Sequence, residues 1–392
     1  MSTPELEGAI ELSVVMPCLN EAETVASCIG KAQEAFRRNG IAGEIIVADN
    51  GSTDGSVEKA QALGARVIHV AVRGYGSALM SGIEAARGKY VLMGDADDSY
   101  DFLELPGFLE RLREGYDLVQ GCRRPAGGGT ILPGAMPFLH RWLGNPMFTF
   151  LARWWFGSRI HDVYCGMRGF TKELYQRLDL RCTGMEFATE MVIKAFLSGS
   201  RIAEVPITLH PDGRKAHAPH LKTFRDGWRT LRFYLMCSPR WLFLFPGLGL
   251  IALGLIGYAL ALPSLHVAGV NFDAHTLLFS NVAIVCGFQA IVFALLTETF
   301  ASQEGLLPDQ PKRGRLRELV TLERGLVLGA VMMLAGIGLL CWAVNFWRET
   351  GFGNLNYSFV MRRIIPGALF TTLGVQTLLA SFFLSILEMR RR

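Results

Sequence analysis

Four long stretches without a charged residue follow one another in the C-terminal part of this 392-residue chain. They run from Trp241 to Leu262, from Thr276 to Thr297, from Gly325 to Trp347 and from Ile365 to Leu387. At a rise of about 1.5 Å per residue, each stretch is long enough as a helix to cross a hydrocarbon core of roughly 30 Å. We therefore expect four transmembrane helices, at about 241–262, 276–297, 325–347 and 365–387.

The composition fits a chain of which only one part is soluble. Half of the residues are hydrophobic and 19% are charged, which is more apolar than an ordinary soluble protein of this length. Charged residues occur throughout the first 240 positions, so the apolar excess lies in the C-terminal part. One or two of the four stretches could instead be buried helices, but a single soluble core accommodates four in succession poorly.

The distribution of basic residues predicts the orientation in the membrane. The N-terminus, MSTPELEGAIELSVVMP, has no basic segment before a long apolar run, so we expect no signal peptide and a cytoplasmic N-terminal domain. Lys and Arg gather between the second and third stretches and at the C-terminus, as expected on the cytoplasmic side. They are Lys312, Arg313, Arg315, Arg317, Arg324, Arg390, Arg391 and Arg392. Arg348, Arg362 and Arg363, near the loop after the third stretch, weaken this argument without reversing it.

Cysteine spacing and net charge limit the range of ligands. None of the eight cysteines is arranged as C-x-x-C, so neither a zinc site nor a thioredoxin-like motif is supported. The net charge of +4 is modest, and basic residues cluster near the membrane segments. This pattern favours anionic lipid or phosphate as a partner rather than nucleic acid.

Short apolar runs alternate with segments of helical spacing in the N-terminal part. Strands are predicted at 12–16, where Pro17 ends the run, and at 44–48, 66–70 and 90–93; helices are predicted at 22–38, 56–63 and 76–86. This alternation indicates βαβ units. We expect an α/β domain over 1–210, with a Rossmann-like, mostly parallel sheet and helices on both faces. A basic amphipathic region would follow over 211–240, and an all-α transmembrane domain over 241–392.

Polar clusters follow three of the predicted strands. They are Asn20-Glu21, Asp49-Asn50, and an acidic run that contains Asp95, Asp97, Asp98 and Asp101. Each cluster alone could cap a helix, build a turn or solvate a loop. The carboxyl ends of parallel strands share one edge of a sheet, where open α/β sheets bind their ligands. The three clusters together therefore predict a binding crevice at that edge.

The spacing of Asp95 and Asp97 suits a divalent cation. Two carboxylates at i and i+2 on one loop can reach a single Mg²⁺, which proteins commonly hold between carboxylates and substrate phosphates. The alternative chemistry, an acid and base pair of a glycosidase, requires two carboxyl groups that flank a sugar from opposite sides. Neighbouring positions on one short loop fit that arrangement less well.

The chain resembles glycosyltransferase family 2, of the GT-A fold. Within that family it is similar to the polyprenyl-phosphate sugar synthases, the branch of dolichol-phosphate mannose and glucose synthases. The matching segments are VVMPCLNEAETV, IIVADNGSTDGS, RGYGSALMSGIEAARGKYVLMGDADD, GCRR, HDVYCGMRGF, GMEFATEMVIKA and AEVPI. They span nearly the whole soluble part in the order typical of the family, so the resemblance is more specific than a lone D-x-D.

The resemblance implies roles for individual residues. Those implied for the donor nucleotide are Pro17, Leu19, Asn20, Glu21, Asp49, Asn50, Ser52, Gly76, Asp95 and Ala96. Those implied for Mg²⁺ or Mn²⁺ are Asp95, Asp97 and Ser99, and the catalytic ones are Asp97, Arg123 and Arg168, the two arginines near the sugar or acceptor phosphate. Ser99 stands where the family often has Gln, and Asp49-Asn50 where it more often has two Asp residues.

The reaction implied is transfer of one sugar from a UDP- or GDP-hexose to a polyprenyl phosphate, undecaprenyl or dolichyl. A phosphate with a second pKa of roughly 6 is already an anion at neutral pH and needs no strong general base. A single in-line displacement inverts the anomeric carbon. Catalysis would rest on alignment and on stabilising the departing diphosphate.

The segment before the first apolar stretch has two helical faces. Lys222, Arg225, Arg229 and Arg232 share one face, and Leu221, Phe224, Trp228, Leu231 and Leu235 share the neighbouring one. A helix of this kind lies in a membrane interface, although it could be an ordinary solvated surface helix. Arg214 and Lys215 lie where the family has basic phosphate contacts, so the acceptor residues implied are Arg123, Arg214, Lys215, Lys222, Arg225, Arg229 and Arg232.

Other candidate ligands and other functions fit this sequence less well. His217 and His220 have no third metal ligand at useful spacing, and Trp142, Trp154 and Trp155 fit packing or the interface better than sugar stacking. A processive polysaccharide synthase shares the GT-A core, but its Q-x-x-R-W signature is missing here. A silent membrane scaffold or lipid carrier would not need Asp95 and Asp97. The sequence is also compatible with a homo-oligomer.

Overall fold

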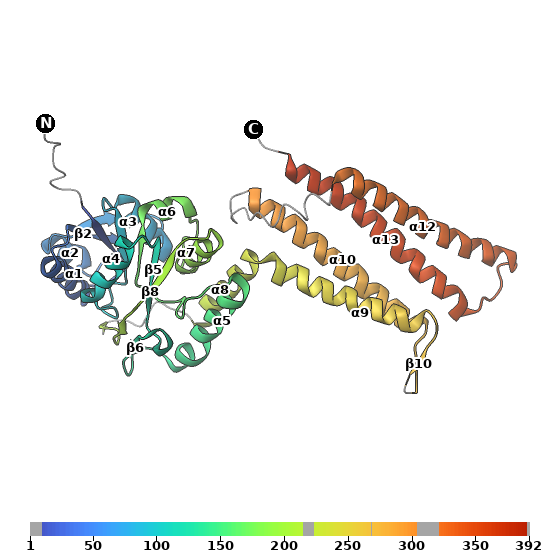
Figure 1. Cartoon of the computed structure of the whole chain (residues 1–392), viewed down its shortest axis with the longest axis horizontal. Helices are drawn as coiled ribbons and strands as arrows, with labels where there is room; N and C mark the ends of the chain where they lie inside the picture. Colours follow the sequence, from blue (N-terminus) through green and yellow to red (C-terminus); the bar gives the residue numbers. More distant parts are fainter. Residues whose placement is uncertain (1–9, 215–222, 268, 304–320, 390–392) are drawn as a thin grey trace. The chain divides into compact units, whose positions relative to one another are not determined.

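The computed structural model describes residues 10–214, 223–267, 269–303 and 321–389 (Figure 1). The chain divides into two compact units, Met1–Tyr234 and Leu235–Arg392. The four predicted strands and three predicted helices in the N-terminal part are all present in the first unit.

A seven-stranded mixed sheet forms the centre of the first unit. Its strands are β1 (Leu12–Cys18), β2 (Gly43–Asp49), β3 (Arg66–His69), β4 (Tyr90–Met93), β5 (Leu118–Cys122), β7 (Arg168–Thr171) and β8 (Ile202–Pro206). Their order is β3-β2-β1-β4-β7-β5-β8. Only β7 runs antiparallel to its neighbours, β4 and β5. The predicted mostly parallel sheet of an α/β domain is thus confirmed.

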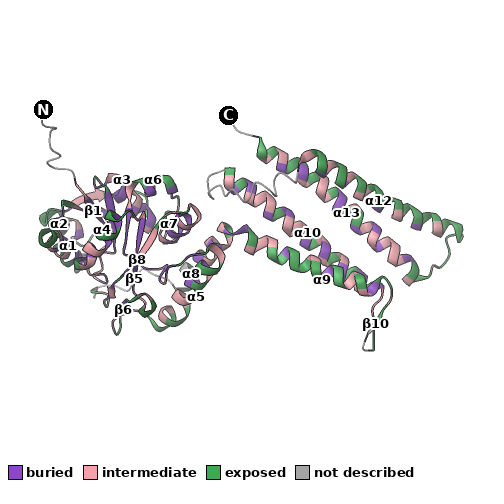
Figure 2. Ribbon diagram, viewed as in Figure 1, coloured by how far each residue is buried: buried purple, intermediate pink, exposed green. Residues whose placement is uncertain are grey.

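Helices cover both faces of this sheet (Figure 1). On one face, α1 (Val25–Asn39) and α4 (Leu105–Arg113) share a hydrophobic core with alternate residues of β1, Val14 and Met16. Val15 points to the opposite face, against α3 (Tyr75–Ala85). Because helices cover both faces, nearly all of β1 is buried, and its residues are mostly apolar (Figure 2).

The first strand is longer than predicted. It continues through Pro17 to Cys18, and Pro17 pairs with Ala48 of β2. Proline is tolerated there because β4 pairs with β1 only as far as Val15, so Pro17 has one neighbouring strand instead of two. The prediction that the strand ends at residue 16, before Pro17, was therefore short by two residues.

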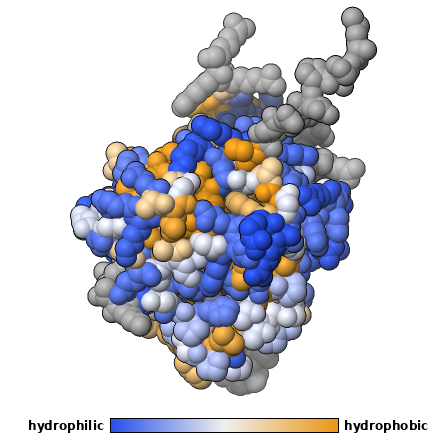
Figure 3. Space-filling model, turned by 90° about the vertical axis from the view of Figure 1, so that its left-hand side faces the viewer, coloured by the Kyte–Doolittle hydropathy of each residue, from blue (hydrophilic) through white to orange (hydrophobic). Residues whose placement is uncertain are grey.

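Shorter elements complete the first unit. They are α2 (Ser56–Ala62), α5 (Asn145–Phe156), α6 (Lys172–Leu178), α7 (Glu186–Leu197), η1 (Phe102–Glu104), η2 (Pro125–Gly127), η3 (His140–Gly144), and the parallel pair β6 (Thr130–Ile131) and β9 (Thr208–Leu209). The boundary between the two units falls in α8 (Thr223–Cys237), after Tyr234. Figure 3 views the left-hand side of Figure 1, and hydrophilic residues, in blue, make up most of the surface that it shows.

Four long helices make up most of the second unit. They are α9 (Phe245–Ala261), which η4 (Arg240–Leu244) precedes, α10 (Ala274–Gln303), α12 (Leu322–Glu349) and α13 (Tyr357–Glu388); a short hairpin, β10 (His266–Val267) and β11 (Val270–Asn271), joins the first two. All four are long and apolar enough to cross a membrane, and only 11 to 33% of the most apolar window of each is buried inside the protein. Their exposed surface, green in Figure 2, therefore suits lipid.

The fourth of these helices begins earlier than the apolar stretch that predicted it. It starts at Tyr357, and Pro366 lies inside it. Its first turns carry Arg362, which forms an ion pair of 2.9 Å with Asp273, the residue just before α10. Deeper along the same two helices, Gln376 donates a hydrogen bond of 3.0 Å to Gln289. The ion pair lets α13 begin with a charged turn before its uncharged segment, and the hydrogen bond satisfies polar side chains within the two apolar segments.

Candidate active site

A cavity of about 1260 Å³ opens in the first unit at the carboxyl ends of the parallel strands. Its polar lining comes from the residues that follow β1, β2, β4 and β5, and includes Asn20, Asn50, Asp95 and Arg123. The chain runs outward from β1 through β2 to β3 and then crosses to β4 on the other side of β1, so the cavity lies where the strand order reverses. Ligands of open α/β sheets bind at such a point.

The loops after β1 and β2 are joined by hydrogen bonds. Asn20 has a left-handed backbone, with φ of 60°. Its N–H donates to Ser52 Oγ at 2.9 Å, and its side-chain oxygen accepts from the Thr53 N–H at 2.9 Å. The Glu21 N–H donates to Ser56 Oγ at 2.8 Å. Two segments distant in sequence therefore form one wall of the cavity.

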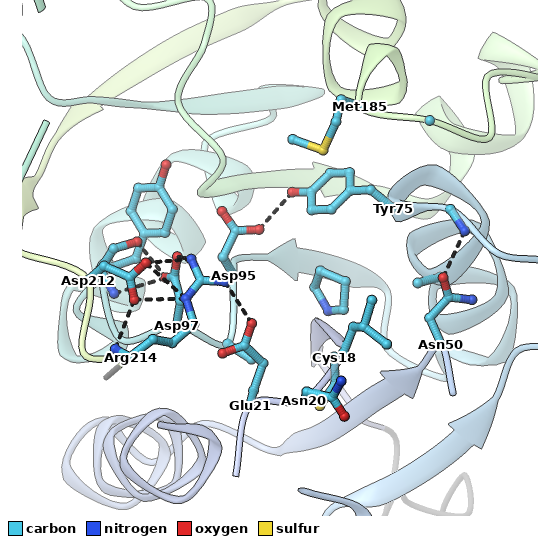
Figure 4. Close-up of a pocket in the computed structure, with 18 of the residues that line it drawn as sticks. Cys18, Asn20, Glu21, Asn50, Tyr75, Asp95, Asp97, Met185, Asp212 and Arg214 are labelled. Atoms are coloured by element: carbon cyan, nitrogen blue, oxygen red, sulfur yellow. Dashed lines mark hydrogen bonds and ion pairs between the residues drawn. The ribbon is translucent and has the colours of Figure 1, made fainter. Parts of the chain in front are cut away.

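The side chain of Asn50 holds the loop that leads into α3. Its oxygen accepts from the Gly74 N–H at 2.7 Å, and its nitrogen donates to the Val72 carbonyl at 2.9 Å (Figure 4). A carboxylate could not donate the second of these bonds. This geometry explains why an amide stands here in place of the family's more common second Asp. It also positions Arg73, which lines the cavity.

Asp95 is held tightly at the back of the cavity. The Tyr75 hydroxyl donates to Asp95 Oδ1 at 2.8 Å (Figure 4). A Cβ atom on Gly166 would lie 2.8 Å from Asp95 Oδ2, so a larger residue there would require this carboxylate to shift. Burial, together with the charge of Asp97, raises the pKa of Asp95 to about 6. The charge of Asp97 therefore opposes ionisation of Asp95, and a cation beside them would favour it.

Asp97 is the second carboxylate in the cavity and contacts two side chains. Ser99 donates to Asp97 Oδ1 through its hydroxyl at 2.6 Å and through its N–H at 3.0 Å. Arg214 Nη2 contacts Asp97 Oδ2 at 3.0 Å. Arg214 also pairs with Glu21 at 3.0 Å and with Asp212 at 2.5 Å (Figure 4). Burial opposes the charge of Arg214, but these carboxylates outweigh it and raise the pKa of the guanidinium.

Arg123 also lines the cavity and is fixed by a buried ion pair. Its Nε and Nη2 atoms donate to the two oxygens of Asp162, at 2.7 and 2.8 Å. Burial disfavours both charges, but their attraction outweighs it, so the pKa of Asp162 is lowered and that of Arg123 is raised. Arg123 Nη1 reaches the Tyr100 hydroxyl at 3.5 Å, and this hydroxyl accepts from the Gly166 N–H. The pair thus holds one cation at the cavity in a fixed orientation.

The oxygen donors fit a hard divalent cation. Carboxylate oxygens are the ligands that Mg²⁺ and Mn²⁺ prefer, and both Asp95 and Asp97 line the cavity. Within the described ranges, no three His, Cys, Asp or Glu residues gather closely enough to hold a metal ion by themselves. Mg²⁺ commonly takes one or two carboxylates from a protein and completes its coordination with phosphate and water, and Asp95 and Asp97 could supply these two.

Most of the predicted site residues with described positions lie together at the cavity. Those that line it are Pro17, Leu19, Asn20, Glu21, Asn50, Asp95, Ala96, Asp97, Ser99, Arg123, Arg214, Arg225 and Arg229. Those that do not are Asp49, Ser52, Gly76, Arg168 and Arg232. Lys215 and Lys222, together with His217 and His220, lie outside the described residues. The same holds for the basic loop residues Lys312 to Arg317 and for Arg390 to Arg392.

The predicted residues that do not line the cavity have structural contacts. Asp49 accepts hydrogen bonds from the Gly51 and Ser52 N–H groups and shapes the turn after β2. A Cβ atom on Gly76 would lie 2.3 Å from the Cys182 carbonyl oxygen, so this glycine permits close packing of α3.

Arg168 lies in the core of the first unit instead of near a bound sugar. It is fully buried in β7, and its guanidinium donates to the backbone carbonyls of Cys165 and Ala188. The structure therefore does not bring Arg168 to the cavity, in contrast to Arg123.

Several residues of the site were not predicted. They are Tyr75, Tyr100, Asp162 and Asp212. Two of them, Tyr75 and Asp162, lie within segments that resemble the family, and Tyr100 lies two residues after such a segment. Asp212 lies two residues before Arg214. None of these residue types indicates its partner by spacing alone, since the partners of Asp162 and Tyr75 are 39 and 20 residues away.

An exposed aromatic surface adjoins the cavity. The lining residues Met136 and Pro137 lead directly into Phe138 and η3. The large apolar side chains exposed on this segment and on α5 are Phe138, Leu139, Trp142, Leu143, Met147, Phe150 and Trp154. On α8, Phe224 is 85% and Trp228 61% exposed. The two helices pack together through Tyr234, whose ring lies 5.8 Å from that of Phe148.

Two family models match the chain. The model described as glycosyl transferase family 2 matches residues 13–179. The model described as the C-terminal transmembrane region of glycosyltransferase family 2 matches residues 295–388. One match thus covers most of the first unit and the other covers much of the second.

Curated proteins that are similar in sequence include two hexose-transferring enzymes of Haloferax volcanii. The low-salt glycan biosynthesis hexosyltransferase Agl6 is 38% identical over 380 residues, which cover 96% of this chain and 89% of that protein. A dolichyl-phosphate hexose transferase is 34% identical over 218 residues, which cover 55% of this chain and 89% of that protein.

Among solved structures, glucosyl-3-phosphoglycerate synthase of Mycobacterium tuberculosis, in complex with Mn²⁺, UDP and glucosyl-3-phosphoglycerate, is similar to this chain. It has a TM-score of 0.47 and 24% sequence identity, and the match covers 57% of this chain and 78% of that chain.

Proposed function

We propose a reaction for this chain on the premise that it belongs to glycosyltransferase family 2: transfer of one hexose from a nucleotide sugar to a polyprenyl phosphate. The observation that carries the proposal is the pair Asp95 and Asp97, which face one large cavity in a chain with four membrane-spanning helices. Such a site suits a donor diphosphate, and such a chain suits a lipid acceptor.

The donor would lie along the edge formed by the loops after β1, β2 and β4. The wall of Leu19, Asn20 and Glu21 would hold the nucleoside, and Asp95 and Asp97 would hold Mg²⁺ or Mn²⁺. When bound, the cation would neutralise charge on the departing diphosphate. Tyr75 would keep the Asp95 carboxylate in one orientation, because its hydroxyl already donates to Oδ1.

The acceptor phosphate would meet the cationic side of the cavity. Arg123 is oriented there by Asp162, and Arg225 and Arg229 of α8 also line the cavity. A phosphate monoester is an anion at neutral pH, so these arginines would bind and align it without a strong base. Attack from the side opposite the leaving diphosphate inverts the anomeric carbon.

The aromatic surface next to the cavity supports a lipid acceptor. Trp142 and Phe150 on η3 and α5, and Trp228 on α8, are all more than half exposed. Helices with this mixture of aromatic and basic residues bind at a membrane interface. A prenyl chain could leave the cavity past Met136 and Pro137 along this surface. The name of one relative, a dolichyl-phosphate hexose transferase, favours the same acceptor class.

The catalytic unit would lie in the cytoplasm. Basic residues between α10 and α12 and at the C-terminus favour this orientation. Among the basic residues at the other end of the bundle, Arg362 is paired with Asp273, and Arg363 stacks over the rings of Trp342 and Phe359. Reporter fusions in the 262–273 loop and after residue 389 should report opposite sides; the same side for both would contradict this topology.

A transfer assay with the purified full-length protein tests the proposal. The protein would be incubated with radiolabelled UDP- or GDP-hexoses, Mg²⁺ or Mn²⁺, and undecaprenyl or dolichyl phosphate. One sugar per lipid is the expected product. A polymer would instead indicate a processive synthase, and no transfer from any donor would indicate a scaffold or lipid carrier.

A further inference from the structure

We propose that Arg214 is an exchangeable counter-ion of the cation site: it gives up Asp97 to the divalent cation and pairs instead with the donor diphosphate. The inference rests on the proposed function and adds to it the residue that couples cation binding to donor binding. The observation behind it is that one guanidinium contacts three carboxylates, Glu21, Asp97 and Asp212, all of which line the cavity.

The contacts of Arg214 compete with a cation. Its Nη2 atom lies 3.0 Å from Asp97 Oδ2, while Asp97 Oδ1 accepts from the Ser99 hydroxyl and N–H. Both oxygens of Asp97 are thus engaged by the protein itself. A divalent cation on Oδ2 would lie close to the guanidinium, and the two positive charges would repel each other. Only one of them can use this oxygen fully.

Arg214 differs in this respect from Arg123. Arg123 is paired with both oxygens of Asp162, and neither residue of that pair has more than 8% of its side chain exposed. Asp162 is not one of the carboxylates that line the cavity. Arg123 therefore keeps its partner when a ligand binds, whereas every ionic partner of Arg214 shown by the structure is exposed to the same cavity as the ligand.

The backbone that carries Arg214 is anchored independently of its side chain. The Gly213 N–H donates to the Asp97 carbonyl at 3.0 Å, and the His210 N–H donates to the Ser99 carbonyl at 2.9 Å. The segment 210–213 is therefore held along the loop that bears Asp97. The long side chain of Arg214 can turn from a carboxylate to a phosphate without a change in this backbone, and guanidinium groups bind both in the same forked geometry.

The proposal predicts that one substitution strengthens the binding of Mn²⁺ and weakens the binding of the nucleotide. In Arg214→Ala, the cation meets no competitor at Asp97, so Mn²⁺ should bind more tightly in the absence of nucleotide, by about tenfold. UDP or GDP in the presence of Mn²⁺ should bind more weakly by a similar factor, because the diphosphate loses its guanidinium partner. A purely structural role for Arg214 would weaken both.

Mn²⁺ titrations followed by electron paramagnetic resonance, with and without UDP and GDP, test this on the full-length protein. Arg214→Gln removes the charge but keeps a hydrogen-bonding side chain, and should change both affinities in the same directions as Arg214→Ala. Arg113→Ala is the control: it removes an arginine that pairs with Glu11 at 2.7 Å and does not line the cavity, and should leave Mn²⁺ affinity without nucleotide unchanged.

Asp97→Asn separates failure of this inference from failure of the proposed function. If Asp97→Asn loses Mn²⁺ while both Arg214 variants bind it no more tightly than the unmodified protein, the counter-ion role is rejected and the cation site stands. If the unmodified protein binds Mn²⁺ and Asp97→Asn binds it equally well, the cation site itself is rejected, and the inference with it.

Discussion

The Tyr75 hydroxyl donates a hydrogen bond of 2.8 Å to Asp95 Oδ1, while Asp95 Oδ2 faces the backbone of Gly166. The protein therefore fixes this carboxylate from two sides. Tyr75→Phe should weaken Mn²⁺ binding by about 10- to 100-fold, because partners that orient a metal ligand typically contribute that much. The measurement is an Mn²⁺ titration of the purified protein. Tyr116→Phe is the control, because the Tyr116 ring lies under Arg201, far along the chain from Tyr75. Equal Mn²⁺ affinities for the unmodified protein and both variants would reject the role of Tyr75.

Asp97→Asn should abolish transfer without unfolding the protein. The amide is close in size to the carboxylate but is a poorer ligand for a hard cation, so we expect a loss of at least about 100-fold in the rate. Transfer rate and melting temperature would be measured together. Asp98→Asn is a matched control on the same loop, since Asp98 pairs with Lys31 at 2.8 Å and does not line the cavity.

The control is suitable for a second reason. Asp98 has a φ of 60°, a conformation that asparagine also adopts readily. Asp98→Asn should keep most of the transfer activity and lose at most about 1 kcal/mol of stability, the usual range for a partly exposed ion pair. Near-normal turnover in Asp97→Asn would reject the cation role of that residue.

Asp162→Asn should destabilise the protein at neutral pH. It leaves Arg123 buried without its counter-charge, which typically costs about 3–5 kcal/mol. The pKa of Asp162 is lowered by Arg123, so the stabilisation is fully present above the unfolded pKa of about 3.9 and is lost as the pH falls through the lower folded value. The difference in stability between the two proteins should therefore persist from pH 7 to about 4 and shrink below that.

Denaturant unfolding at several pH values would measure this effect. Arg113→Gln is a suitable comparison, because its partner Glu11 lies on the surface, and exposed pairs contribute about 1 kcal/mol or less. A similar small loss for Asp162→Asn would show that the buried pair is dispensable for the fold.

Replacing Trp142 and Phe150 together by serine should weaken use of the lipid acceptor. Both side chains are at least 60% exposed on the helical segment next to the cavity, so their loss should barely affect the core. Loss of their burial in the membrane interface should raise the apparent KM for polyprenyl phosphate in vesicles by roughly tenfold, equivalent to about 1.4 kcal/mol. Leu103→Ser, an exposed apolar residue on η1, is the control. An unchanged KM in the double variant would argue against contact between this surface and the membrane.

The sequence alone determined the larger organisation of the chain. Uncharged stretches long enough to span a bilayer fixed the four helices of the second unit, because lipid leaves few other structures possible. The alternation of apolar runs and helical periods fixed the mostly parallel sheet. Polar residues after β1, β2 and β4 could be predicted to meet, because the ends of parallel strands share one edge.

Tertiary structure decided which of the chemically similar residues face that edge. Arg123 and Arg168 are equally basic in sequence, yet only Arg123 lines the cavity, because the antiparallel β7 carries Arg168 into the core. Arg214 was predicted for the acceptor phosphate, whereas the fold pairs it with Asp97, 117 residues away. Such pairings depend on distances between segments far apart in the chain, and local periodicity carries no information about them.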